Sequence, residues 1–240
     1  MSYPQLASTN SELKRLLGTK KMAEYSLVIT HHQTAGKGQA GNSWESAAHQ
    51  NLTFSILLRP NFLAPHLQFY ISKAVSLALV DTIRQTAQLD ASIKWPNDIY
   101  VGDKKVCGIL IENSIVGSRL DYCIVGIGLN VNQEQFVSDA PNPVSLKQLT
   151  NKSFKLETVL EHLLDNIEYR YHQLETNRLE LVNQDYTKAL YRGEGFHAYK
   201  DDNGTFEARI DSINEMGLMT LVDTQGTKRE YAFKEVNFVL

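Results

Sequence analysis

The sequence predicts an α/β domain over residues 1–190, followed by a small all-β domain over residues 191–240. Three observations lead to this prediction. The chain has 240 residues, more than one typical domain and less than two. Strand-like apolar runs alternate with amphipathic helical segments up to about residue 190. From Arg192-Gly193 onward only short β runs remain, and about fifty residues are enough for a small β-barrel.

The first third of the chain reads as helix, strand, loop and strand. Thr9-x-x-Glu12 has the pattern of a capping box that opens a short helix ending near Gly18. The run Tyr25–Gln33 is rich in β-forming residues and leads into a loop with three glycines. Apolar residues alternate along Asn51–Pro60, which predicts a strand with one buried face.

The remaining elements continue the alternation. Apolar residues recur at helical spacing from Leu67 to Ile83, which predicts a long amphipathic helix. Residues 92–115 read as strand, turn and strand, with Gly102-Asp103 at the turn. Residues 121–133 form another strand-like run before a polar loop rich in Asn and Pro, and Leu156 to about Tyr186 is helical again. The C-terminal turn signals are Asn203-Gly204, Met216-Gly217 and Gln225-Gly226.

Composition excludes several classes of protein. The net charge is −3, so no overall basic character indicates a nucleic-acid partner. The two cysteines, Cys107 and Cys123, lie in apolar runs and read as buried free thiols. The N-terminal residues lack the basic and apolar regions of a signal peptide, and no apolar stretch is long enough to span a bilayer. We therefore expect a cytoplasmic protein without a membrane partner.

The glycine loop spells Gly36-x-Gly38-x-x-Gly41, the dinucleotide-binding fingerprint. That fingerprint requires a following helix and an acidic residue about 20 positions later. Here the loop runs into another strand, and no Asp or Glu lies near Asn61, so we reject NAD. With Lys37 inside it and Trp44 after it, the loop could wrap an anionic ligand and cover an aromatic ring. On this segment alone a mobile surface hairpin is an equally good interpretation.

Lys94 is the second candidate for ligand contact. It stands between Ile93 and Trp95, ahead of Asn97 and Asp98 at a Pro turn, which favours partial burial. A buried lysine exerts a stronger field on a bound carboxylate or phosphate, although a strand-end lysine can also simply reach solvent. The stretch Val125–Asn132 adds two glycines in an apolar strand, a mark of close backbone approach or a bulge.

Taken together, these segments resemble a biotin protein ligase. "STN", "QTAGKGQAGNSW", "KWPNDIY…KKVCGILIE" and "GIGLNVN" come in the order and approximate spacing of that family. With the β-rich tail, the resemblance covers nearly the whole chain. It implies an α/β (α+β) catalytic domain with a mixed sheet flanked by helices, then a small C-terminal SH3-like β-barrel. Because "STN" begins at Ser8, we expect the monofunctional type without a DNA-binding domain and without a nucleic-acid partner.

The resemblance also implies an activity. Such ligases use ATP and Mg²⁺ to activate biotin as biotinyl-5′-AMP with release of pyrophosphate. They then pass the biotinyl group to one lysine of the biotin carboxyl carrier protein of a biotin-dependent carboxylase. Neither step needs a nucleophile from the enzyme, so positioning and charge stabilisation are what the chain must supply. Members of the family often dimerise through exposed sheet edges, so a homodimer is possible.

Carried over to this chain, the resemblance assigns catalytic roles to Lys94 and Lys37. The residues expected to bind biotin are Ser8, Thr9, Asn10, Gln33, Gly36, Lys37, Gly38, Lys94, Gly108 and Gly126. Those expected to bind the nucleotide are Gln39, Trp44 and Asn130, with Asn130 also near the Mg²⁺. No side chain is assigned as a metal ligand. Thr9 is expected both to cap its helix and to face the pocket, whereas Lys105 is expected to be a solvated turn lysine.

Departures from the family pattern leave two alternatives. Many members carry several arginines in the glycine loop, whereas this chain has Gln39 and Ala40 after Lys37. Fewer charges there could weaken phosphate contacts, but we expect activity to survive because Lys37 and Lys94 remain. One alternative is a lipoate ligase or octanoyl transferase, which share this catalytic fold. The other is a non-catalytic biotin-binding module.

Overall fold

The larger part of the protein is built on a seven-stranded sheet. The computed structural model describes residues 1–138 and 141–239, without the side chain of Ala40. Asp139 and Ala140 of the Asn- and Pro-rich loop, and Leu240 at the end of the expected β domain, lie outside this range. The sheet order is β1 (Ser2–Tyr3), β2 (Leu27–Thr30), β5 (Leu52–Leu58), β9 (Arg119–Leu129), β8 (Lys104–Val116), β7 (Asp98–Val101) and β6 (Ser92–Lys94).

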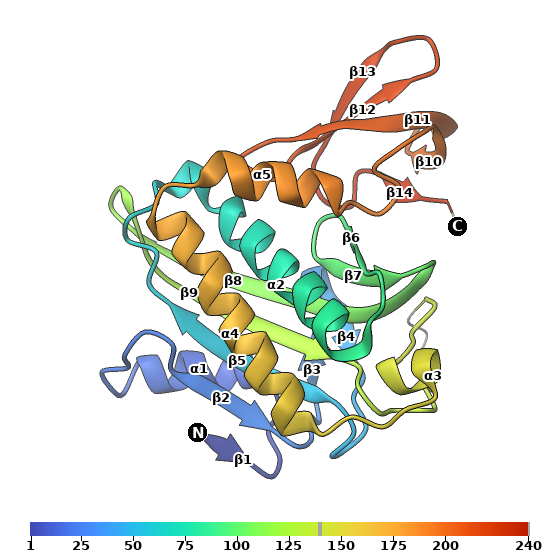
Figure 1. The fold of residues 1–240 in the computed structure, drawn as a ribbon. Helices are drawn as coiled ribbons and strands as arrows, with labels where there is room; N and C mark the ends of the chain where they lie inside the picture. The colour runs from blue at the N-terminus through green and yellow to red at the C-terminus, as the bar shows by residue number, and fades with distance from the viewer. Residues whose placement is uncertain (139–140, 240) are drawn as a thin grey trace.

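The sheet is mixed, as expected. The pair β1–β2 is parallel, and the other five neighbouring pairs are antiparallel. Helix α1 (Thr9–Leu17) covers one face near β2 and β5. Helices α2 (Phe69–Ala87), α4 (Leu156–Glu175) and α5 (Leu179–Lys188) lie on the other face, as Figure 1 shows. The short helix α3 (Leu146–Thr150) and the 3₁₀ turns η1 (Gln39–Gly41) and η2 (Pro65–Leu67) complete this part.

The expectation of a single buried face on residues 51–60 is wrong. All seven residues of β5 are buried. Phe54, Ile56 and Leu58 belong to the larger core beneath α2 and α4, whereas Leu57 packs with Leu13 of α1. Because helices cover both faces, the alternation along β5 separates apolar residues from small polar ones rather than buried from exposed ones.

The predicted capping box at Thr9 is also wrong. Ser8 is the N-cap residue, and its side chain makes no capping hydrogen bond. Thr9 is the first helical residue, and its backbone N–H donates to Oε1 of Gln33. Glu12 instead accepts hydrogen bonds from Arg15 and Tyr3. Tertiary contacts to Gln33 therefore replace the local cap that the sequence pattern indicates.

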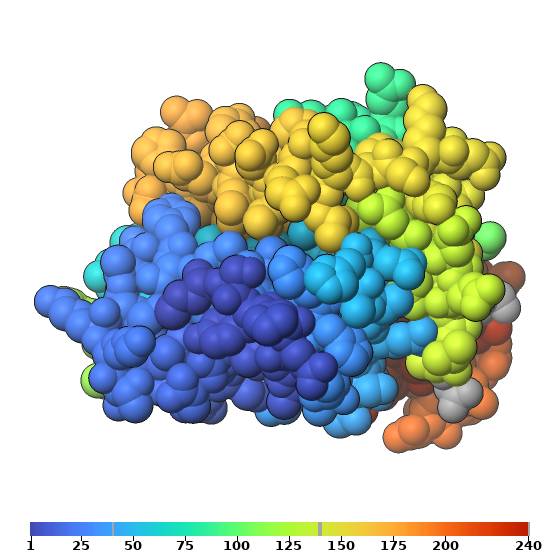
Figure 2. Space-filling model, turned by 90° about the horizontal axis from the view of Figure 1, so that it is seen from below, coloured from blue at the N-terminus to red at the C-terminus, as the bar shows by residue number. Residues whose placement is uncertain are grey.

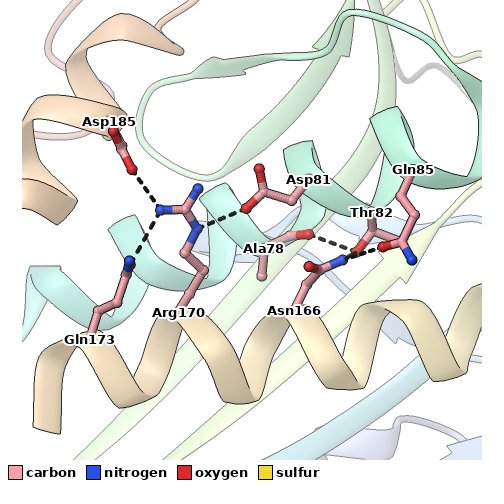
Figure 3. A network of polar contacts seen from close by, with 8 residues as sticks. All are labelled: Ala78, Asp81, Thr82, Gln85, Asn166, Arg170, Gln173 and Asp185. Atoms are coloured by element: carbon pink, nitrogen blue, oxygen red, sulfur yellow. Dashed lines mark hydrogen bonds and ion pairs between the residues drawn. The ribbon is translucent and has the colours of Figure 1, made fainter.

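The helical segment predicted over residues 156–186 is two helices. Asn177, with φ +56°, lies in the turn between α4 and α5. Figure 3 shows how the two are tied to α2: Arg170 of α4 donates to Asp81 of α2 at 2.8 Å and to Asp185 of α5 at 2.7 Å. One turn earlier on α4, Asn166 donates to Thr82 and Gln85 of α2.

The C-terminal residues form the expected small β domain. Its antiparallel sheet has the order β13 (Lys228–Tyr231), β12 (Met219–Asp223), β11 (Gly204–Ile213), β10 (His197–Asp201) and β14 (Asn237–Phe238). Within the described residues β13 and β14 each pair with one strand only, so the hydrogen-bonded sheet is open rather than a closed barrel. Lys73 of α2 donates to the Ile213 carbonyl, and Trp95 donates to that of Gly217, which fixes this domain against the first.

The surface opposite the C-terminal domain is formed by the N-terminal residues. Figure 2, seen from below, shows β1 at the surface beside other N-terminal residues in blue, with α4 above them. Among the described residues, no helix has both the length and the apolar character needed to cross a membrane.

Candidate functional site

One cavity of about 430 Å³ collects most of the predicted site residues. It is bounded by the start of α1, the glycine loop, the turn after β6, the central strands and the segment between β13 and β14. Of the thirteen residues assigned from the sequence, all but Gly36 and Asn130 line it. The expected grouping of segments that lie far apart in the sequence is therefore present in the structure.

The floor of the cavity is made by Gly108, Leu110, Gly126 and Gly128, which belong to two paired rows across three strands. Thr53, Gly128 and Gly108 pair in one row, and Ser55, Gly126 and Leu110 pair in the next. The Trp44 ring lies on Gly128 and Gly108, where a Cβ atom would overlap it. The Asn10 side chain occupies the same position over Gly126. The glycines do permit close approach, but here Asn10 and Trp44 are the groups that approach.

Thr9, Asn10 and Gln33 form a polar network at one end of this floor. Oε1 of Gln33 accepts from the Thr9 backbone N–H at 2.9 Å. Oδ1 of Asn10 accepts from Ser55 at 2.6 Å, and Nδ2 of Asn10 donates to Glu112 at 2.8 Å and to the Leu110 carbonyl at 3.3 Å. Asn10 thus uses its polar atoms on the protein, which leaves Thr9 and Gln33 to face the cavity.

The glycine loop is a short hairpin over the cavity. Its strands β3 (Gly36–Lys37) and β4 (Ser43–Trp44) pair antiparallel, with Gly36 opposite Trp44. A Cβ at Gly36 would overlap the Trp44 carbonyl, so this glycine serves the hairpin and is buried behind the lining. Nζ of Lys37 donates to Ser11 of α1 at 2.8 Å, which closes the hairpin onto that helix.

Lys94 lies at the other end of the cavity among aromatic groups. Its Nζ donates to the Tyr100 hydroxyl at 3.0 Å and lies 4.7 Å from the centre of that ring and 5.3 Å from that of Phe238. Burial lowers the pKa of Lys94 below the usual lysine value, and the nearby charges of Lys105 and Arg192 add to this while Asp98 opposes it. No described carboxylate forms an ion pair with Lys94, so the charge is open to an anionic ligand.

The expectation that Lys105 is a solvated turn lysine is wrong. It lies on β8 and lines the cavity, and its side chain is 22% exposed. Its Nζ lies 2.7 Å from Oδ1 of Asp98 and 5.6 Å from the centre of the Trp44 ring. The β7–β8 hairpin brings Lys105 opposite Tyr100, two residues from Asp98. The short turn at Gly102-Asp103 fixes the register of the two strands and is the one sequence signal for this pairing.

The C-terminal domain supplies part of the cavity wall. Phe233, Val236, Asn237 and Phe238 line it, and none of them was assigned from the sequence. These residues lie more than a hundred positions from Lys94, and no local pattern marks them as part of a site. Only the docking of the two domains brings the Phe238 ring onto the Lys94 ammonium group.

Asn130 is the one predicted nucleotide residue that does not reach the cavity. It is 2% exposed, and its Nδ2 donates to the Val144 carbonyl at 3.1 Å, whereas Oδ1 has no partner. An oxygen of this kind suits Mg²⁺ chemically, but it is enclosed by protein. The described residues contain no group of three or more His, Cys, Asp or Glu side chains placed to hold a metal.

Comparison with known proteins decides the family. Residues 2–130, more than half of the chain, match the family described as "Biotin/lipoate A/B protein ligase family". The chain belongs to this biotin/lipoate ligase family. The matched region contains α1, the glycine loop, Lys94, Lys105 and the strand residues of the floor, so it includes most of the cavity.

Other members of the biotin/lipoate ligase family extend the match beyond residue 130. The bifunctional ligase/repressor BirA of Bacillus subtilis is 31% identical over 239 residues, which span 96% of this chain and 71% of the relative. The biotin--[acetyl-CoA-carboxylase] ligase of Mycobacterium tuberculosis is 28% identical over 169 residues, 69% of this chain and 61% of the relative. Because it spans 96% of this chain, the Bacillus subtilis alignment reaches into the helices and the C-terminal domain.

Solved structures share the whole fold. The biotin protein ligase of Aquifex aeolicus in complex with biotin and ATP has a TM-score of 0.82 and 23% identity, covering 100% of this chain and 98% of that one. The biotin acetyl coenzyme A carboxylase synthetase of Helicobacter pylori with bound biotinylated ATP has a TM-score of 0.63 and 21% identity over 96% of this chain and 98% of that one. Both domains of the chain are thus arranged as in this fold.

Proposed function

We propose that the chain is an ATP-dependent ligase that adenylates biotin to biotinyl-5′-AMP and transfers biotin to a lysine of a biotin carboxyl carrier protein. One observation carries the proposal: the Thr9–Gln33 pair and the two lysines, Lys94 and Lys105, face opposite ends of a single cavity of about 430 Å³. Family membership and the printed functions of the relatives support the same activity.

The two ends of the cavity suit the two ends of biotin. The neutral polar atoms of Thr9 and Gln33 suit the ureido head, and the lysines suit the carboxylate that reacts. In the first step a carboxylate oxygen attacks the α-phosphorus of ATP, and pyrophosphate leaves. In the second step the carrier lysine attacks the acyl carbon, and AMP leaves. Both transition states gather negative charge near oxygen atoms, which Lys94 and Lys105 can stabilise from fixed positions.

The loop residues are proposed to contact the nucleotide. Trp44 offers an aromatic face in the cavity, and Lys37 and Gln39 of the same hairpin also line the cavity. Nε1 of Trp44 and Oε1 of Gln39 are buried without a hydrogen-bond partner, so a shift of the hairpin over a ligand would give them partners. Because Asn130 is enclosed, we do not assign it a ligand contact. Mg²⁺ is proposed to be bound mainly through the ATP phosphates.

The proposed macromolecular partner is the carrier domain of a biotin-dependent carboxylase, in line with the name of the Mycobacterium tuberculosis relative. The possible homodimer, the lack of a nucleic-acid partner and the cytoplasmic location remain predictions from the sequence. The alternative within this family is a ligase or transferase for lipoate or octanoate, since the family description includes lipoate. A non-catalytic binding module is the second alternative.

Isotope exchange between pyrophosphate and ATP tests the first step and separates the candidates. We expect exchange that depends on biotin and not on lipoate. Lys94→Ala and Lys105→Ala should each lower the rate by about a hundredfold or more, as expected for loss of one preorganised charge. Lys104→Ala is the matched control, because Lys104 is exposed and outside the cavity lining. Exchange driven by lipoate would show that lipoate, not biotin, is the substrate. Biotin binding without exchange would favour the non-catalytic binding module.

A further inference from the structure

Two residues beside the cavity floor, Ser55 and Glu112, are not among those that line it, yet both are bonded to Asn10. We propose that Ser55 and Glu112 are positioning residues that decide which atoms of Thr9 and Gln33 donate and which accept hydrogen bonds in the biotin pocket. This inference rests on the proposed function. It concerns the selectivity of the pocket rather than the chemical step.

The orientation of the Asn10 amide is fixed by its neighbours. Nδ2 lies 2.8 Å from Oε2 of Glu112 and 3.3 Å from the Leu110 carbonyl oxygen. A carboxylate and a carbonyl only accept hydrogen bonds, so the NH₂ group must be on this side. Oδ1 of Asn10 then necessarily faces Ser55. Asn10 is 3% exposed and lies directly over Gly126, where a Cβ atom would displace it.

The Asn10 orientation in turn fixes the proton of Ser55. The Ser55 hydroxyl has a single proton, and Oδ1 of Asn10 at 2.6 Å is an acceptor only, so that proton points at Asn10. The hydroxyl oxygens of Ser55 and Thr9 lie 2.7 Å apart. This short contact needs a proton between them, and only Thr9 has one left. Thr9 therefore donates to Ser55.

The consequence appears at the cavity surface. The Thr9 proton cannot also serve the longer contact of 3.3 Å to Oε1 of Gln33, whose partner is the Thr9 backbone N–H at 2.9 Å. Thr9 Oγ1 is left with a lone pair and acts as an acceptor. Because Oε1 of Gln33 is held by Thr9, Nε2 of Gln33 is the donor. An acceptor beside a donor complements a cyclic urea, in which an N–H lies next to a C=O.

Burial makes this arrangement persistent. Ser55 is 0% exposed and Thr9 is 4% exposed, so water cannot easily offer the hydroxyl groups other partners. In such a site each hydrogen bond polarises the next, and reversing one would leave a buried group unpaired. The order starts from the Glu112 carboxylate and runs through Asn10 and Ser55 to Thr9. Removing Ser55 would free the Thr9 proton, and Thr9 could then donate to a ligand.

The test compares biotin with cyclic carbamate analogues in which one ureido N–H, on either side, is replaced by oxygen. Affinities are measured by calorimetry for the full chain. Wild type should bind biotin more than about tenfold more tightly than the less tolerated analogue. In that analogue a ring oxygen faces Oγ1 of Thr9, so repulsion between two lone pairs replaces a hydrogen bond. In Ser55→Ala this preference should fall by about tenfold, because the freed Thr9 hydroxyl can donate to the carbamate oxygen.

Two controls separate this role from a general structural one. Thr53→Val removes another buried hydroxyl of β5, which donates to the Thr30 carbonyl and does not touch the network, and it should keep the preference. Glu112→Gln still offers an acceptor to Asn10 and should keep it too, whereas Glu112→Met should reduce it. If Ser55→Ala does not fold, this Glu112 pair decides the matter.

The outcomes also separate this inference from the proposed function. Biotin binding by wild type, with the same preference retained in Ser55→Ala or in a folded Glu112→Met protein, would overturn the inference and leave the ligase proposal intact. Failure of wild type to bind biotin at all would overturn both.

Discussion

At the scale of single residues, the sequence predicts the environment of one cavity lysine, Lys94, better than that of another, Lys105. Partial burial of Lys94 was predicted from its apolar neighbours, and the structure confirms it. The aromatic surroundings of Lys94 were not predictable, because Phe238 belongs to a different domain. Lys105 was misjudged because its environment depends on the register of a hairpin and on the Asp98 side chain. A residue's neighbours in sequence thus predict burial better than they predict partners.

The lowered pKa of Lys94 leads to a pH prediction. Burial disfavours the charged form, so Lys94 loses its proton at a lower pH than an ordinary lysine. Affinity for a non-hydrolysable biotinyl-AMP analogue should therefore fall as the pH rises through this lowered value. Lys94→Arg should keep its affinity to higher pH, since a guanidinium stays protonated. Titrations across alkaline pH measure this, and identical profiles for both proteins would contradict the role of Lys94.

At the scale of elements, the strands carry the site through their small residues. The two glycines of the apolar run Val125–Asn132 were predicted to mark close approach or a bulge, and the structure confirms close approach at Gly126 and Gly128. Which groups approach was not predictable, because Asn10 and Trp44 come from segments far away in the sequence. Gly128 was not assigned a ligand contact, although it lies beneath the Trp44 ring. The periodicity of apolar residues predicted the strands. The residues of the cavity floor are brought together by the register between β5, β9 and β8, which the periodicity does not predict.

Gly126→Ala tests this use of the strands. The new methyl group would overlap Oδ1 of Asn10 and push that side chain off the floor. We expect biotin affinity to fall by about tenfold or more, with a stability loss of about 1–3 kcal/mol for overpacking. Gly18→Ala is the control, because a Cβ there makes only ordinary contact with the Arg15 carbonyl at 3.5 Å. Calorimetry and denaturant titration give the two values. Unchanged biotin affinity in Gly126→Ala would show that Asn10 does not need this space.

At the scale of the whole molecule, the cavity depends on how two domains meet. The sequence indicated both domains through the change of texture near residue 192, but not their contact. Lys73 illustrates why: it is 1% exposed, and its Nζ donates to Asn183 of α5 at 2.6 Å and to the Ile213 carbonyl of β11 at 3.1 Å. It also lies 4.9 Å from the centre of the Tyr70 ring. An amphipathic reading of α2 does not predict a lysine in this position.

Lys73 gives a prediction about stability and pH. Burial lowers its pKa from 10.5 to about 8, which corresponds to a cost of about 3 kcal/mol for keeping it charged. Below pH 8 the folded protein bears this full cost. Between about pH 8 and 10.5 the unfolded chain binds more protons, so this contribution makes the wild type more stable as pH rises. In Lys73→Met the rise should be absent. Urea unfolding across this range measures it, and parallel curves for both proteins would contradict the assignment.

The most direct test of the central claim is the mass of a biotin carboxyl carrier domain after incubation with the chain, ATP, Mg²⁺ and equal amounts of biotin and lipoate. The cavity with Thr9 and Gln33 at one end and Lys94 and Lys105 at the other predicts a gain of one biotinyl group on a single lysine. The gain should be lost in Lys94→Ala and kept in Lys104→Ala. A lipoyl gain, or an unchanged carrier in the presence of tightly bound biotin, would contradict the account.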